Sequence, residues 1–165
     1  IMNMGNYAHG NQPIQHMLYL YNYAGAPSKT QYWSREVMNK LYQAAPDGYC
    51  GDEDNGQTSA WYVFSALGFY PVTPGTDEYV LGSPLFKKAT VKLENGKKIE
   101  INAPANSKAH KYVNQLSVNG KSYSKTWVSH KELTKGSVLN FNMSTTPNKS
   151  RGIHKADFPY SFSNE

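Results

Sequence analysis

The hydrophobic pattern of this chain changes its period near residue 70. Between residues 13 and 67 the apolar residues recur at three- and four-residue spacing, as in Ile14, Met17 and Leu18, which is typical of helices that bury one face. Between residues 79 and 145 apolar and polar residues alternate, which is typical of strands with one buried face. The sequence therefore predicts an α+β fold in which helices come first and an antiparallel β-region follows.

Three helices are expected before residue 70. Pro13 suits the first turn of the first helix, where a missing N–H costs nothing. Ser28 and Gln31 fit a capping box at the start of the second helix. The third helix, expected over residues 58–67 and ended by Gly68, is apolar nearly all round. Such a helix is normally buried on every side, which predicts a larger helical assembly around it.

Two Asn-Gly pairs organise the β-region. Asn95-Gly96 and Asn119-Gly120 each follow an alternating segment, and this dipeptide favours the type I′ turn of a two-residue hairpin. We expect residues 79–145 to form an antiparallel sheet or half-sandwich. Residues 146–165 are polar and irregular, and we expect a tail that wraps a surface.

Composition excludes several classes of protein. The formal charge is +5, but the lysines are spread along the predicted strands and no nucleic-acid-binding motif accompanies them. Cys50 is the only cysteine, so an internal disulfide is impossible. No apolar run approaches the roughly 18 residues of a membrane span. Aromatic residues make up 13% of the chain, which suits either an ordinary aromatic core or a carbohydrate-binding surface.

Potential catalytic or metal-binding side chains are most concentrated in residues 47–57, which hold four carboxylates and three glycines among eleven residues. In an extended loop Asp52 and Asp54 would leave the same face, and such a pair can hold one ionised carboxylate against a water molecule as a general base. A solvated turn whose aspartates cap a helix is the structural alternative. The spacing fails the EF-hand pattern, because Gly51 and Tyr62 would occupy positions that need acids. A calcium site of another kind stays open.

A second polar segment begins the first helix. Residues 10–13, Gly-Asn-Gln-Pro, offer the amides of Asn11 and Gln12 to a sugar hydroxyl or a cation, and His16 follows one turn later. A plain helix cap by Asn11 is the alternative. A metal site built on His9 and His16 alone lacks a third ligand.

Several long motifs resemble glycoside hydrolase family 92, the bacterial exo-acting α-mannosidases. They are GNQPIQH at 10–16, YLYNYAG at 19–25, the acidic loop at 47–57, SAWYVFSALGFYPV at 59–72 and DEYVLGSPLF at 77–86. The resemblance covers essentially the whole chain.

The resemblance implies a calcium-dependent, inverting α-mannosidase with an (α/α)6-barrel catalytic domain, acting on mannose-containing glycans, with α-1,2 linkages expected. Residues 1–70 would be the last barrel helices with the acidic loop, and residues 71–165 an antiparallel β-region and tail. Asp52 and Asp54 resemble the general-base aspartates, whereas the family's general acid is a glutamate expected upstream of residue 1. We therefore expect a C-terminal fragment, inactive alone, whose partner is the missing N-terminal part or a second copy. The family implies a periplasmic, cell-surface or secreted location.

The remaining site residues follow from the same resemblance. Asn11, Gln12 and His16 are candidates for sugar binding, and Glu53 and Gln12 for calcium binding. Many relatives have glutamate where this chain has Gln12, so this position departs from the family pattern by one negative charge. Two other functions remain open from the sequence: a non-catalytic carbohydrate-binding module and a purely structural domain.

Overall fold

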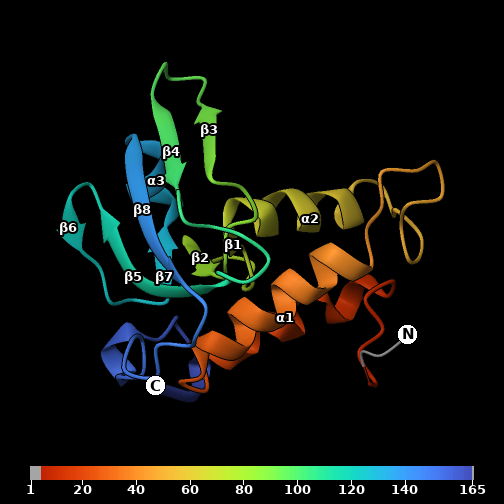
Figure 1. The fold of residues 1–165 in the computed structure, drawn as a ribbon, viewed down its shortest axis with the longest axis horizontal. Coiled ribbons are helices and arrows are strands. Elements are labelled where there is room, and N and C mark those ends of the chain that lie inside the picture. Colours follow the sequence, from red (N-terminus) through yellow and green to blue (C-terminus); the bar gives the residue numbers. More distant parts are fainter. Residues whose placement is uncertain (1–4, 165) are drawn as a thin grey trace.

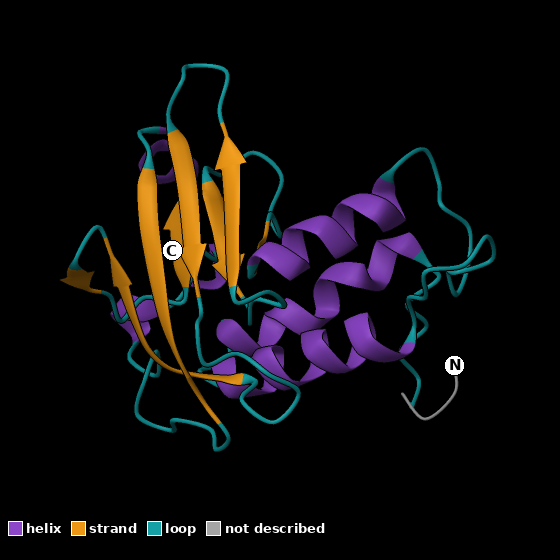
Figure 2. Ribbon diagram, turned by 45° about the horizontal axis from the view of Figure 1, so that its top comes forward, coloured by secondary structure: helices purple, strands orange, loops and turns teal. Residues whose placement is uncertain are grey.

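The computed structural model describes residues 5–164, and the three long helices and the strands occupy opposite halves of the molecule (Figures 1 and 2). The first four residues, where the predicted helical part begins, lie outside the described range. The helical half consists of η1 (Gln12–Asn22), a 3-10 helix, and the α-helices α1 (Pro27–Lys40) and α2 (Gln57–Leu67).

The helix ends follow from local sequence. Pro13 lies in the first turn of η1, as predicted. Gly68 ends α2 in the left-handed conformation, with φ 99°, which a glycine adopts without a steric penalty. The predicted capping box at Ser28 is wrong, because α1 begins at Pro27 and no side chain caps it. Gln31 instead turns its side chain toward the β-region, where it accepts the N–H of Val113.

The β-region contains two sheets. The smaller has the order β1-β2-β7, with β1 (Phe69–Tyr70), β2 (Glu78–Leu81) and β7 (Trp127–Ser129). The larger has the order β3-β4-β8-β5-β6, with β3 (Lys88–Lys92), β4 (Lys98–Asn102), β5 (Tyr112–Val118), β6 (Lys121–Ser122) and β8 (Ser137–Ser144). All named pairs are antiparallel except β4 with β8, which is parallel. The predicted α+β class, helices followed by antiparallel sheets, is confirmed.

The two hairpin turns differ. Asn119 and Gly120 have φ values of 52° and 79°, as a two-residue type I′ turn between β5 and β6 requires. At the other turn only Gly96 has a positive φ, and the N–H of Leu93 pairs with the carbonyl of Lys97. The type I′ prediction is wrong there, because three residues rather than two close the loop and only the last one turns left-handed.

The core has two parts. One fills the space between the two sheets and includes Leu81 and Val128 from the smaller and Ile101 and Leu139 from the larger. The other lies among the helices and centres on Trp61, which is fully buried. Short elements close the periphery: α3 (His130–Thr134), η2 (Lys155–Asp157) and η3 (Phe162–Asn164).

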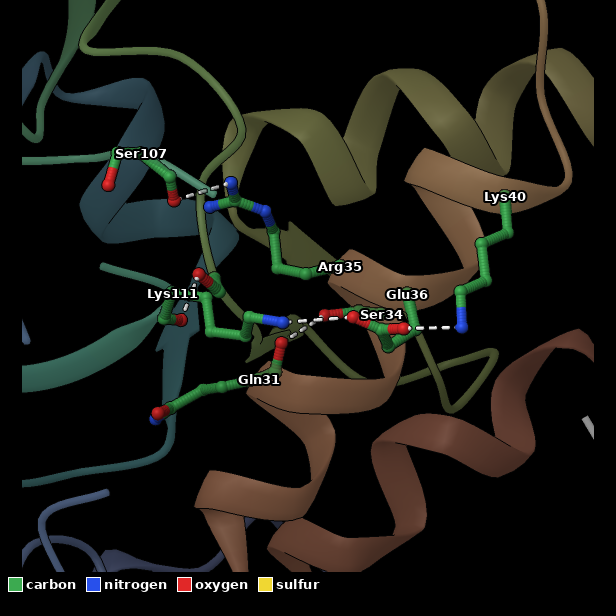
Figure 3. Close-up of polar contacts among 8 residues, drawn as sticks. Gln31, Ser34, Arg35, Glu36, Lys40, Ser107 and Lys111 are labelled. Carbon is green, nitrogen blue, oxygen red and sulfur yellow. Dashed lines mark hydrogen bonds and ion pairs between the residues drawn. The ribbon is translucent and has the colours of Figure 1, made fainter. Parts of the chain in front are cut away.

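Helix α1 joins the halves through polar contacts (Figure 3). Arg35, 2% exposed, donates to the carbonyl of Ser107, and Lys111 forms an ion pair with Glu36. These contacts fix the helices against the segment that leads into β5.

Parts of the helical surface stay apolar and exposed. Met17 and Leu20 of η1 are 46% and 41% exposed, and Val63 of α2 is 56% exposed. No segment among residues 5–164 covers this face of the third helix, and the larger helical assembly expected around it stays a prediction. Among residues 5–164, no helix is both long and apolar enough to cross a membrane. The division at residue 70 into two domains stays a prediction.

Candidate functional site

The acidic loop connects α1 to α2 and rests on the segment that begins η1. A bridge between Tyr42 and Tyr49 closes its base. At its middle, Gly51 packs against Gly10 so closely that a Cβ atom on Gly51 would lie 2.6 Å from the Cα of Gly10. Because both partners are backbone, neither can move aside, and this contact requires glycine.

Gln12 ties the loop to the start of α2. Its Nε2 donates to the backbone carbonyl of Asp52 at 2.8 Å and to Oγ1 of Thr58 at 3.2 Å. The hydroxyl of Thr58, which is fully buried, also donates to the carbonyl of Asp52 at 2.9 Å. The backbone of Asp52 is therefore held by two donors from two different helices.

Glu53 holds the first turn of α2. Its Oε1 accepts the N–H of Ser59 at 3.1 Å, and its Oε2 accepts the N–H of Gly56. Hydrogen bonds from Ser59 first, and then from Gly56, lower the pKa of this carboxyl. Glu53 therefore acts as a helix cap in place of the aspartates for which the sequence suggested that task.

Asp52 and Asp54 flank this cap and are both exposed. Within residues 5–164 neither carboxylate has a hydrogen bond or an ion pair. The premise of an extended loop is wrong, because Asp54 and Asn55 have positive φ values of 51° and 58°. Aspartate and asparagine tolerate this conformation better than other side chains, and it turns the chain into α2. Asp52 thus precedes a tight turn, and Asp54 is the first residue within it.

His9 lies beneath the loop in an aromatic cage. It is fully buried, with Nδ1 2.7 Å from the hydroxyl of Tyr7 and Nε2 2.7 Å from the hydroxyl of Tyr42. Its ring meets Trp61 edge-on, with 4.3 Å between ring centroids. Burial lowers the pKa of His9 to about 4, so the ring is neutral at pH 7. Both ring nitrogens are already used by tyrosine hydroxyls, so neither is free to pair with His16 around a metal.

The other predicted binding residues are less engaged. Asn11 is exposed and precedes η1, but its side chain forms no cap there, so the plain-cap interpretation is wrong. His16 is half-buried, and its ring makes no hydrogen bond within the described residues. The structure brings Gln12, Asp52 and Glu53 to one place and links neither Asn11 nor His16 to them by a hydrogen bond.

Sequence reasoning missed the amide and hydroxyl groups that support the loop. Gln15 is fully buried and donates to the carbonyl of His9, while Gln57 donates to Oε1 of Gln15 and to the hydroxyl of Tyr70. The signal was present, since Gln57 and Thr58 are polar residues at the start of an otherwise apolar helix.

A hollow of about 420 Å³ lies beside the loop. Its walls include Tyr42 and Tyr49 from the base of the loop and Ser59 and Tyr62 from α2. The hydroxyl of Tyr49 lies 2.6 Å from Oγ of Ser59, the residue whose N–H binds Glu53. An aromatic wall therefore adjoins the helix start that the acidic loop caps.

The described residues do not complete a calcium site. Calcium takes six to eight oxygen ligands, yet among residues 5–164 no three histidine, cysteine, aspartate or glutamate side chains converge. Both oxygens of Glu53 are occupied by backbone N–H groups, and Gln12 offers only its Oε1. This chain alone could supply part of a shell.

Comparison with known families decides the assignment of this chain. Residues 1–145 match the glycosyl hydrolase family 92 catalytic domain. The chain belongs to this family.

Solved structures agree with the assignment. A family GH92 inverting mannosidase from Bacteroides thetaiotaomicron VPI-5482 is 56% identical, with a TM-score of 0.92 over 98% of this chain and 22% of its own. A family GH92 α-mannosidase from Bacteroides thetaiotaomicron, solved with mannoimidazole, is 42% identical, with a TM-score of 0.94 over 96% of this chain and 21% of its own.

A sequence relative comes from a fungus. An uncharacterized secreted glycosidase of Arthroderma benhamiae is 27% identical over 137 residues, which are 81% of this chain and 18% of that protein. The chain therefore spans about a fifth of the length of the relatives it matches.

Proposed function

We propose that this chain is the general-base part of an inverting α-mannosidase catalytic domain. In this proposal Asp52 and Asp54 take a proton from the water that attacks the anomeric carbon of a terminal α-mannose. The observation that supports the proposal is that the three adjacent carboxylates of residues 52–54 differ in their hydrogen bonds. Glu53 is occupied by backbone N–H groups, whereas the carboxylates on either side are exposed and have no partner within the described residues.

The loop also has the rigidity that general-base catalysis needs. A base must keep its carboxylate within hydrogen-bond reach of the water. The two donors on the carbonyl of Asp52 and the cap formed by Glu53 fix the backbone on both sides of the turn. In inverting enzymes the acid and base carboxyls stand roughly 6.5–9.5 Å apart, which leaves room for the water.

The acid partner belongs to another part of the enzyme in this proposal. Glu36, for example, is committed to ion pairs with Lys40 and Lys111. We therefore expect the isolated 165-residue chain to release no mannose from α-mannosides. Turnover by the purified chain would contradict this assignment of roles.

A chimera tests the base directly. This chain would replace the aligned segment of the 56%-identical inverting mannosidase, and Asp52→Asn and Asp54→Asn would then be compared in the chimera. We expect kcat to fall about 10²- to 10⁴-fold with KM little changed. Proton NMR of the first product should show β-mannose from the active chimera.

Glu53→Gln is the matched control in that chimera, because it changes an adjacent carboxylate that caps a helix. It should lower the free energy of unfolding and leave kcat close to that of the parent chimera. A folded chimera in which both aspartate variants keep full kcat would rule out the general-base assignment. Comparing mannobioses with α-1,2, α-1,3 and α-1,6 linkages would test the expected α-1,2 preference.

Calcium enters the proposal as an ion shared with residues outside this chain. Gln12 would contribute its Oε1, and the rest of the shell would come from the remainder of the enzyme, because both oxygens of Glu53 accept backbone N–H groups. We expect calorimetry to show no tight calcium binding by the isolated chain, and chelation to inactivate the chimera. A location outside the cytoplasm, with mannose-containing glycans as substrate, completes the proposal and agrees with a relative described as secreted.

A further inference from the structure

The outer face of the larger sheet carries a second hollow, far along the chain from the acidic loop, in which amide and hydroxyl side chains stand beside the apolar Pro104, Leu116 and Phe141. It has a volume of about 440 Å³ and crosses β4, β8, β5 and β6. The long strands β5 and β8 are strongly bent (Figure 2). Its polar lining comes from Asn102, Gln115, Ser117, Ser122, Asn140 and Asn142.

The residue types in this hollow contradict the usual preferences of strands. Asparagine is depleted in strands, whereas threonine and β-branched residues are favoured there. Yet outward positions of β8 hold Asn140 and Asn142, between the inward-facing Leu139, Phe141 and Met143. Residues that a strand disfavours and that add nothing to the core are candidates for a functional role.

The amides are also preorganised. Nδ2 of Asn102 donates to Oδ1 of Asn140 at 3.0 Å, and Nδ2 of Asn114 donates to Oδ1 of Asn142 at 3.0 Å. These cross-strand bonds fix the side-chain orientations. Nδ2 of Asn142 and the whole amide of Gln115 keep their hydrogen-bonding capacity, since neither has a side-chain partner within residues 5–164. A ligand would find fixed donors and acceptors, which lowers the entropy cost of binding.

Charge narrows the class of ligand. No charged side chain lines the hollow. The lysines of this sheet lie outside the lining: Lys88, Lys92 and Lys98 are on β3 and β4, and Lys121 is on β6 beside Ser122. A neutral, polyhydroxylated molecule suits such a lining, because each amide can donate to one hydroxyl and accept from its neighbour.

We propose that this hollow is a glycan-binding surface, separate from the acidic loop, that holds neutral sugar chains through the amides of β4, β5 and β8. The proposal goes beyond the hydrolytic role, and only the choice of mannan as the first probe rests on that role. The one aromatic residue of the lining, Phe141, is buried in the core and offers little ring surface for stacking, so we expect weak binding, with Kd on the order of millimolar per site.

The test is affinity electrophoresis and calorimetry of the chain with yeast mannan, dextran and heparin. The test variants are Gln115→Ala and Asn142→Ala, with the near-isosteric Gln115→Glu and Asn142→Asp as a second pair that preserves shape. Thr90→Ala, an exposed outward position on β3 of the same sheet, is the matched control. Circular dichroism would verify that each variant folds.

We expect binding of mannan or dextran that weakens about five- to tenfold for each amide removed, and that Thr90→Ala leaves unchanged. Asp52→Asn with Asp54→Asn should bind as well as the parent chain, which separates this surface from the hydrolytic site. Absence of neutral-glycan binding by the folded chain, or equal binding by the amide variants, would overturn the proposal. So would salt-sensitive binding of heparin alone, which would assign the face to anionic polymers bound by the lysines at the two edges of the sheet.

Discussion

The side-chain amide of Gln12 donates to the backbone carbonyl of Asp52 across 2.8 Å, which joins residues 40 positions apart in the sequence. This contact connects the start of η1 to the acidic loop. It explains how a neutral residue can serve where many relatives are expected to have glutamate, because the amide supplies a donor that a carboxylate lacks.

Replacing Gln12 with glutamate should therefore loosen the loop in this chain. The carboxylate would face the carbonyl of Asp52 without a proton to donate, and we expect a loss of about 1–2 kcal/mol in the free energy of unfolding. Urea titration measures this loss, and hydrogen exchange should show faster opening of residues 50–56. Gln43→Glu, an exposed amide near the other end of the loop, is the control. Equal stability of the two variants would mean that Gln12 does not hold the loop.

Glu53 gives a prediction in acid. Hydrogen bonds from Ser59 and Gly56 lower its folded-state pKa below the unfolded value. The unfolded chain therefore takes up the proton first, so this stabilisation is complete above the ordinary glutamate pKa and is lost as pH falls through the lowered one. Glu53→Gln should remove that dependence and increase exchange of the first α2 amides at pH 7. Glu94→Gln, on the exposed β3–β4 turn, should change neither.

The sequence predicted the elements better than it predicted the support of the site. The order of helices and strands followed from periodicity, and Gly68 marked the end of α2 correctly. The capping role of Glu53 did not follow, because the sequence does not distinguish three adjacent carboxylates. Only the left-handed turn at Asp54 and Asn55 decides which of them caps the helix. The cage around His9 depends on Tyr42, 33 positions away, and no local pattern carries such a contact.

His9 should make the fold sensitive to mild acid. Its pKa is about 4 in the folded chain against 6.5 for the unperturbed group, so the unfolded state binds a proton more readily. Stability is therefore complete above pH 6.5, falls as pH drops toward 4, and has lost about 3 kcal/mol below that. His9→Gln should flatten this part of the profile, measured by urea unfolding from pH 7 to pH 4. His154→Gln, at an exposed position, should leave it as it is.

Arg35 supports the junction between the helices and the sheets, and its removal should cost more than the loss of one contact. Its Nη1 donates to the carbonyl of Pro84 at 2.8 Å and to Oδ1 of Asn106 at 2.6 Å, and its Nη2 donates to the carbonyl of Ser107. Burial lowers the pKa of the guanidinium. Arg35→Met retains the apolar stem but leaves buried acceptors without donors.

We expect Arg35→Met to lower the free energy of unfolding by about 3 kcal/mol. Arg35→Lys should recover only part of this loss, because one ammonium cannot reach three acceptors in the planar arrangement of the guanidinium. Lys40→Ala, on the same helix and half-exposed in its ion pair with Glu36, should change stability far less, because solvent screens an exposed ion pair. Thermal unfolding of the three variants measures these differences in stability. If the lysine variant is as stable as the parent chain, the charge alone holds this junction and the directional hydrogen bonds do not.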